Sequence, residues 1–157
     1  MSIHEKLLVC DDKIIHACRN WVMPFSRFAI FLVYFWFGML KVLALSPASP
    51  LVIALLERTM PWIAPDAFLL GFGIVEVLIG LLFLIPHLER LAIFALVLHL
   101  VTTIMPLFLL PQIAWSGFMV PTLEGQYIIK NVLIVAIAIG ILAHLHSDKE
   151  QSLPKLQ

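Results

Sequence analysis

Hydrophobic residues dominate four long stretches of the chain, which run from about Phe28 to Leu45, Ala67 to Pro86, Leu91 to Leu110 and Gln126 to Leu145. Each stretch approaches the roughly 20 apolar residues that a helix needs to cross a bilayer. The stretches are continuous rather than alternating, which excludes a transmembrane barrel, and a helix satisfies its backbone hydrogen bonds internally. The pattern predicts an all-α polytopic membrane protein, a bundle of four transmembrane helices. No repeat of fixed period and no long linker divides the chain, so we expect a single membrane domain over residues 1–157.

Two segments outside these spans also predict helices. Residues Met1 to Met23 lack the long apolar region of a cleaved signal peptide, and their scattered apolar residues predict a short helix at the inner interface. Between the first two spans, Leu51 to Met60 forms an apolar run that is bounded by prolines and is too short to cross the bilayer. We expect an interfacial or re-entrant helix there.

The composition supports a membrane protein and excludes several other classes. The chain of 157 residues is 62% hydrophobic and 13% charged, with a mean hydropathy of +1.03 and a net charge of zero. Soluble domains are about 45–50% apolar and about 25% charged. The balanced charge argues against a nucleic-acid partner, and the hydropathy argues against a disordered chain. Two cysteines, Cys10 and Cys18, are too few for a disulfide-built scaffold.

The basic residues outside the spans predict the orientation of the bundle. Four precede the first span, one lies in the turn between the second and third spans, and two follow the fourth, whereas the opposite side holds only Arg58. The seven are Lys6, Lys13, Arg19, Arg27, Arg90, Lys149 and Lys155. Because cytoplasmic loops carry an excess of Lys and Arg, we expect both termini to be cytoplasmic.

Glu76 is the first candidate for a functional residue inside the membrane. It is the tenth of the twenty residues of the second stretch, too central for its side chain to reach either surface. A charge at this depth costs about 2.5–3.5 kcal/mol on insertion scales and therefore suggests a function. Gly73 and Gly80 share its helical face and would let a neighbouring helix approach closely. We expect Glu76 to face the bundle, either protonated or paired with a cation.

The other spans bring further polar residues toward the same depth. The predicted layer consists of Tyr34, Lys41, Glu76, His99, Thr103, Lys130 and Asn131. Thr102 and Pro106 lie on the His99 face, and the proline frees a backbone carbonyl there. Either lysine lies about a turn and a half above Glu76, within reach of an extended side chain. We interpret the layer as a ligand-binding or proton-relay site.

The same residues are also consistent with purely structural roles. Lys41 and Lys130 could extend to the outer headgroups, and His99 could hydrogen-bond between helices. Glu76 could form a structural ion pair with Lys41 or Lys130, which would make the polar layer a lock that holds the bundle together. The sequence has no Cys-x-x-Cys, zinc-protease, phosphate-loop or nucleophile-elbow motif. His144 and His146 point to different faces of a helix, and we expect no metal site.

Three segments resemble the DoxX-like membrane proteins, especially their YkgB branch. They are the first-span Phe35-Trp36-Phe37-Gly38-Met39-Leu40-Lys41, the second-span run from Gly73 to Gly80 with Glu76 inside it, and the run from Glu124 to Asn131 at the start of the fourth span. In the third span the family often has Thr-Thr-Pro, where this chain has two residues between Thr103 and Pro106. The resemblance implies a small four-helix protein of the bacterial inner membrane. Relatives are linked with quinone-reducing thiosulfate oxidation and with resistance to oxidative or reactive-chlorine stress.

Three functions are consistent with these observations. The first is a membrane component of a redox or oxidative-stress-response system that binds a quinone or a similar small apolar ligand. Lys41, Lys130 or His99 would donate a hydrogen bond to the ligand, and Glu76 would exchange a proton. The second is a small proton-coupled transporter acting as a homo-oligomer. The third is a non-catalytic assembly protein. The expected partners are the lipid bilayer and a membrane or periplasmic redox protein, with no nucleic acid.

Overall fold

The computed structural model describes the backbone of residues 3–152 and the side chains of residues 11–145. The helices and strands follow one another as α1 (Ile3–Val42), α2 (Ser49–Thr59), α3 (Pro65–Leu84), α4 (Glu89–Ile104), α5 (Pro106–Leu109), α6 (Pro111–Ala114), β1 (Trp115–Gly117), β2 (Val120–Pro121) and α7 (Leu123–Ser152). The only sheet among the described residues is the two-stranded antiparallel hairpin of β1 and β2. The predominantly helical class is confirmed.

Four helical segments are long and apolar enough to cross a membrane, as the hydrophobic pattern predicts. They are Asp11–Val42, Pro65–Leu84, Glu89–Leu109 and Leu123–Leu145. At most 28% of the most apolar window of each segment is buried inside the protein, so most of its apolar side chains face outward. A soluble protein rarely exposes apolar surface so extensively, and the surface fits a lipid environment. The structure thus supports a multi-pass membrane protein.

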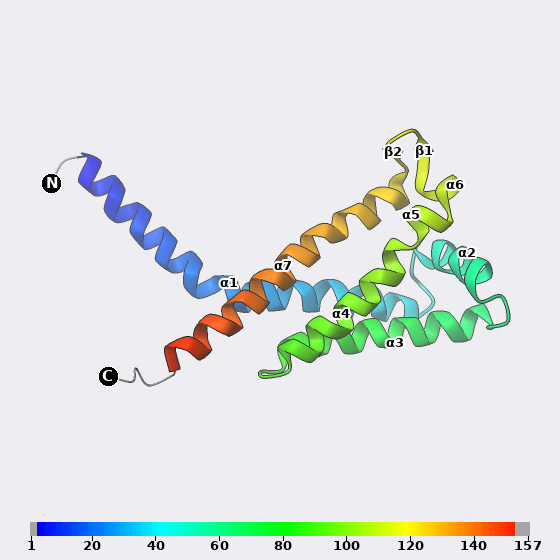
Figure 1. The fold of residues 1–157 in the computed structure, drawn as a ribbon, viewed down its shortest axis with the longest axis horizontal. Coiled ribbons are helices and arrows are strands. Elements are labelled where there is room, and N and C mark those ends of the chain that lie inside the picture. Colours follow the sequence, from blue (N-terminus) through cyan, green and yellow to red (C-terminus); the bar gives the residue numbers. More distant parts are fainter. Residues whose placement is uncertain (1–2, 153–157) are drawn as a thin grey trace.

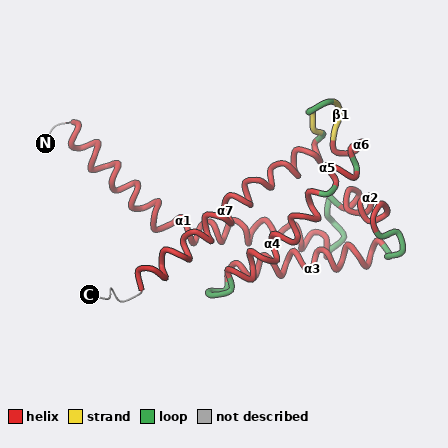
Figure 2. Tube along the Cα trace, in the orientation of Figure 1, coloured by secondary structure: helices red, strands yellow, loops and turns green. Residues whose placement is uncertain are grey.

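The connections between the long helices gather at two opposite ends of the molecule. The start of α1, the turn between α3 and α4 and the end of α7 lie at one end (Figure 1). Helix α2, helices α5 and α6 and the hairpin lie at the other end, and Figure 2 shows that the longer loops are also there. The start of α1 and the end of α7 thus lie at the same end of the molecule, as an even number of membrane crossings requires.

Helix α1 corrects one prediction made from the sequence. The expected short N-terminal helix is not separate, because α1 is continuous from Ile3 to Val42. Pro24 lies inside α1, and the first part of the helix diverges from the bundle (Figure 1). Proline removes a backbone hydrogen bond and its ring clashes with the preceding turn, so it bends a helix without necessarily ending it.

Glycines bring α1 and α3 into close contact along much of their length. A Cβ atom added to Gly38 would lie 2.8 Å from the Gly73 carbonyl oxygen, and one added to Gly73 would lie 2.8 Å from the Gly38 carbonyl oxygen. A Cβ atom on Gly80 would lie 2.9 Å from the Phe35 nitrogen. Such approach of two backbones is the usual role of small residues between transmembrane helices. The spacing of Gly73, Glu76 and Gly80 therefore does mark the face of α3 that meets another helix.

The outer connections contain one expected and one unexpected element. Helix α2 occupies Ser49–Thr59, close to the predicted run from Leu51 to Met60. The connection between α4 and α7 folds into two short helices and the hairpin, which the sequence analysis did not predict. The Trp115 indole N–H donates to the Leu107 carbonyl oxygen at 3.0 Å and the Thr122 hydroxyl donates to the Ile113 carbonyl oxygen at 2.6 Å. These side chains satisfy carbonyl groups that the short helices leave without backbone partners.

Candidate functional site

Glu76 forms a direct ion pair with Lys41 inside the bundle. The Lys41 Nζ atom lies 2.6 Å from Glu76 Oε2, and the two side chains are 6% and 8% exposed. The pair joins α1 to α3 at the level of Gly38 and Gly73, where the backbones are closest. The expectation that Glu76 faces the bundle and pairs with a cation is therefore met, with Lys41 rather than Lys130 as the partner.

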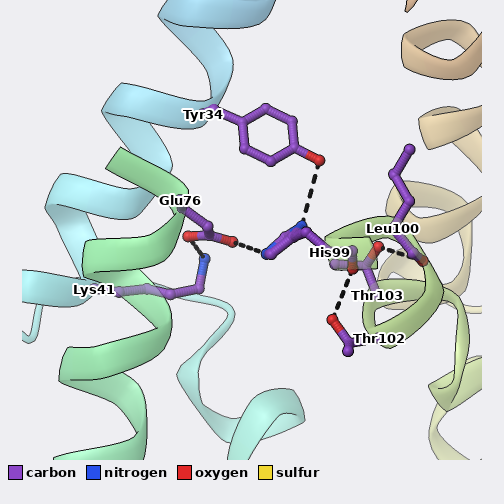
Figure 3. Close-up of polar contacts among 7 residues, drawn as sticks. All are labelled: Tyr34, Lys41, Glu76, His99, Leu100, Thr102 and Thr103. Atoms are coloured by element: carbon purple, nitrogen blue, oxygen red, sulfur yellow. Dashed lines mark hydrogen bonds and ion pairs between the residues drawn. The ribbon is translucent and has the colours of Figure 1, made fainter. Parts of the chain in front are cut away.

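His99 approaches the same carboxylate from α4. Its Nε2 atom lies 3.1 Å from Glu76 Oε1, and the Tyr34 hydroxyl lies 3.3 Å from its Nδ1 atom (Figure 3). The Phe72 ring stacks on the imidazole with 4.7 Å between the centroids. Tyr34, Lys41, Glu76 and His99 are all buried. We call these four residues the polar cluster.

The ring nitrogens of His99 are not equally satisfied. Nδ1 contacts the Tyr34 hydroxyl, whereas Nε2 is buried and has no partner in hydrogen-bonding geometry. The 3.1 Å contact of Nε2 with Glu76 is thus close in distance but poorly aligned. If the tyrosine hydroxyl donates to Nδ1, the proton of a neutral imidazole sits on Nε2, beside the carboxylate. The cluster then has a ring N–H that is free to meet a better-placed acceptor.

Lys41 also retains hydrogen-bonding capacity. An ammonium group has three N–H donors, and Glu76 is the one acceptor that the structure gives it among the described residues. The ammonium nitrogen lies 5.7 Å from the centroid of the Phe72 ring. Phe72 therefore touches both the histidine and the lysine of the polar cluster.

The two threonines of α4 do not join the polar cluster. The Thr102 hydroxyl donates to the His99 carbonyl oxygen at 2.7 Å, and the Thr103 hydroxyl donates to the Leu100 carbonyl oxygen at 3.0 Å (Figure 3). Both bonds run back along the same helix just before the break at Pro106. Such side-chain bonds compete with the helical backbone pattern and accompany bends. Thr103 therefore shapes the helix that carries His99 and makes no contact with Glu76.

The predicted residues of the fourth span lie apart from the polar cluster. Lys130 is exposed, with its Nζ atom 5.1 Å from the centroid of the Tyr127 ring. Asn131 is half-buried. Tyr34 and Lys41 of α1, Glu76 of α3 and His99 of α4 build the cluster, and no hydrogen bond or ion pair among the described residues joins Lys130 or Asn131 to it.

A second, partly buried ionic contact was not expected from the sequence. The Arg27 guanidinium donates to the Phe83 carbonyl oxygen at 2.8 Å and to Glu89 Oε1 at 2.6 Å. It therefore joins α1 to the end of α3 and the start of α4. Its signal in the sequence was that Arg27 and Glu89 border spans at the same end of the bundle. In the count of basic residues that predicts the orientation, Arg27 is only one of the charges that precede the first span.

The described residues contain no group of three or more His, Cys, Asp or Glu side chains that could hold a metal ion. A hollow of about 320 Å³ lies between α1 and α7 and is lined by Val22, Met23, Ser26, Ala136, Ile137, Gly140, Ile141 and His144. None of its lining residues belongs to the polar cluster. The polar cluster is therefore not part of this hollow, and the Phe72 ring packs against it.

Comparison with known proteins gives no family for this chain: no family model, no curated protein and no solved structure matches it.

Proposed function

We propose that this protein is an inner-membrane component of a redox or oxidative-stress-response system, of the DoxX-like type, and that its polar cluster binds a quinone or a similar small apolar molecule. The observation that carries the proposal is the buried Nε2 atom of His99, which lies 3.1 Å from Glu76 Oε1 without an aligned hydrogen bond. Leaving a buried donor unsatisfied costs about 1–3 kcal/mol, and a ligand carbonyl would remove that cost.

The surroundings of His99 suit the ring of a quinone. A flat ring already packs on the imidazole, since Phe72 stacks there at 4.7 Å. A quinone ring that replaced Phe72 would bring its carbonyl oxygens toward the Lys41 ammonium, which lies 5.7 Å from the Phe72 centroid. Ligand sites of this kind combine apolar walls with a few polar groups that fix orientation.

Protons can be held next to such a ligand. Glu76 lies between Lys41 and His99, at 2.6 Å and 3.1 Å from their nitrogens. A carboxyl and an imidazole are the side chains that most often exchange protons near neutral pH when their surroundings shift their affinities. Glu76 and His99 are therefore the proton-exchanging residues of the proposal, and Lys41 orients the carboxylate.

The proposed orientation follows from the basic residues. The end of the molecule that holds the start of α1, the turn between α3 and α4 and the end of α7 faces the cytoplasm, because it carries the excess of Lys and Arg. A membrane or periplasmic redox protein would then reach the protein through the bilayer or from the side of α2 and the hairpin.

The test is the affinity of purified protein in lipid nanodiscs for a short-chain ubiquinone analogue. His99→Gln should weaken binding by about tenfold, because it deletes the hydrogen bond to the ligand, worth about 1 kcal/mol or somewhat more. Glu76→Gln should weaken it less, through loss of the ion pair that holds Lys41 in place. Lys130→Gln is the matched control and should bind like the wild type, since Lys130 is exposed and its ammonium lies over the Tyr127 ring, which is not part of the polar cluster. Absence of binding by the wild type, or equal weakening by Lys130→Gln, would refute the proposal.

The structural lock is the competing function, favoured by the direct pairing of Lys41 with Glu76 between glycine-packed helices. It predicts that Glu76→Gln lowers the unfolding temperature of the solubilised protein and leaves resistance to oxidants unchanged in cells. The ligand proposal predicts that His99→Gln, which keeps the ion pair, impairs that resistance while the protein remains folded. The two variants measured together separate the two functions.

A further inference from the structure

Helix α1 is much longer than one crossing of a bilayer requires. Its 40 residues extend over about 60 Å at the rise of an α-helix, whereas the hydrocarbon core is about 30 Å thick. The part after Pro24, residues 25–42, falls within the range of about 17–25 residues that cross a bilayer. The part before Pro24 diverges from the bundle in Figure 1, and its described side chains from residue 11 to residue 20 are all exposed. We call this part, up to Met23, the arm.

The arm has one apolar and one polar face. At 3.6 residues per turn, its apolar side chains fall on one side of the helix and most of its polar ones on the other. The apolar face consists of Ile14, Ile15, Cys18, Trp21 and Val22, with Asp11 at its N-terminal end, and the polar face of Asp12, Lys13, His16, Arg19 and Asn20. Ile14 is 57% exposed and Trp21 is 69% exposed, so the described chain leaves most of the apolar face uncovered, and only Val22 borders the hollow beside α7.

The apolar face continues without a break into the membrane-crossing part of α1. Trp21, Phe25, Phe28 and Leu32 follow one another at spacings of four, three and four residues, and all are exposed. They therefore form one stripe along the helix. Since lipid surrounds this stripe at Phe28 and Leu32, the same surroundings extend to the arm. We propose that the arm is an interfacial helix, whose apolar face lies in the boundary between the headgroups and acyl chains of the membrane.

The width and charge of the arm favour lipid over a second copy of the chain. Ile15 and Val22 flank the stripe, which makes the apolar face wider than the narrow seam of a two-stranded coiled coil. On the arm, the carboxylates of Asp11 and Asp12 balance the charges of Lys13 and Arg19. The arm should therefore associate with the membrane through its apolar face, independently of anionic lipid and of salt.

Spin labels on the two faces test the proposal in full-length protein. Cys18 lies on the apolar face, so Cys10→Ser leaves it as a single labelling site; adding Cys18→Ser and His16→Cys moves the label to the polar face two residues away. A third protein, with Leu32→Cys in the cysteine-free background, provides the lipid-facing reference. The proteins are placed in vesicles of phosphatidylethanolamine and phosphatidylglycerol, and collisions of each label with oxygen and with a water-soluble nickel complex are measured.

We expect the Cys18 label to resemble the Leu32→Cys label, with frequent oxygen collisions and loss of nickel collisions, and the His16→Cys label to show the reverse. The pattern should persist in vesicles of phosphatidylcholine alone and at high salt. Strong nickel collisions at both positions would mean that the arm stands in water, and would overturn the proposal. Loss of both kinds of collision at Cys18, with spin–spin broadening between copies, would overturn it in favour of a dimer. Unfolding temperatures equal to that of the wild type establish that the labels leave the bundle intact.

Discussion

The close contact of α1 with α3 makes a sharp prediction for Gly73→Ala. The added methyl group would lie 2.8 Å from the Gly38 carbonyl oxygen, 2.8 Å from Lys41 Cβ and 3.0 Å from the Val42 nitrogen. Carbon atoms in contact normally lie about 3.5–4.0 Å apart. Two of the three neighbours are backbone atoms, so the helices must separate. Overpacking of this kind costs about 1–3 kcal/mol.

Gly71→Ala is the matched control on the same helix. A Cβ atom at Gly71 meets nothing within 4 Å. Both substitutions gain the same intrinsic preference of alanine for a helix, about 1 kcal/mol in soluble proteins. That gain cancels when the two variants are compared, so the difference in unfolding free energy between them isolates the clash. We expect Gly73→Ala to be about 1–3 kcal/mol less stable than Gly71→Ala.

Reversible unfolding in mixed micelles of increasing SDS content, followed by circular dichroism, measures this difference. At 1.4 kcal/mol for each tenfold change in the equilibrium constant, the expected gap corresponds to at least about a fivefold change in the folded-to-unfolded ratio. Gly73→Ala should also weaken the ion pair, because the methyl group presses against the stem of Lys41. Equal stability of the two variants would refute the inference that glycine is required for the approach of α1 and α3.

Three further substitutions test individual contacts by the same unfolding assay. Lys41→Met should lower the free energy of unfolding by about 3–5 kcal/mol, because it leaves a buried carboxylate without its cation. Adding Glu76→Leu should restore most of this loss. Failure of the second change to restore stability would contradict this reasoning. Arg27→Gln should cost about 2 kcal/mol, since it removes charged hydrogen bonds to Glu89 and to a carbonyl of α3, whereas the exposed Arg19→Gln should be neutral. Trp115→Phe should cost about 1 kcal/mol by deleting one hydrogen bond while keeping most of the ring, and a larger loss would mean that the ring packing also changed.

The elements that were predicted correctly depend on local patterns. A run of about 20 apolar residues predicts a spanning helix whatever its neighbours are, and all four runs correspond to helices that are long and apolar enough to cross a membrane. The inward orientation of Glu76 could also be predicted from nearby residues, because glycines three residues before it and four after it share its helical face.

The elements that were missed depend on how helices rotate against one another. Lys41 and Lys130 occupy similar depths in their spans, and nothing local distinguishes which of them turns toward Glu76. The structure turns Lys130 outward, beside the Tyr127 ring. The continuity of α1 through Pro24 was missed for a different reason: proline bends a helix or ends it, and the choice depends on the surrounding contacts. The Arg27–Glu89 contact joins residues 62 positions apart, far beyond any periodic pattern.

In the polar cluster the Lys41–Glu76 pair is fully formed, whereas His99 Nε2 lacks an aligned hydrogen bond. This difference favours a ligand site over a structural lock alone. A lock needs the Lys41–Glu76 pair and the close helices that exclude lipid from it, and both are complete in the structure. It does not need His99, whose Nε2 atom is buried 3.1 Å from a carboxylate without forming an aligned hydrogen bond. A site that must accept another molecule requires such a group, because a fully satisfied cluster has no hydrogen bond left to offer. His99→Leu combined with Tyr34→Phe, which removes the hydroxyl that would otherwise lose its partner, should therefore leave the bundle as stable as the wild type or more so, whereas a histidine that served the lock would make this double variant less stable.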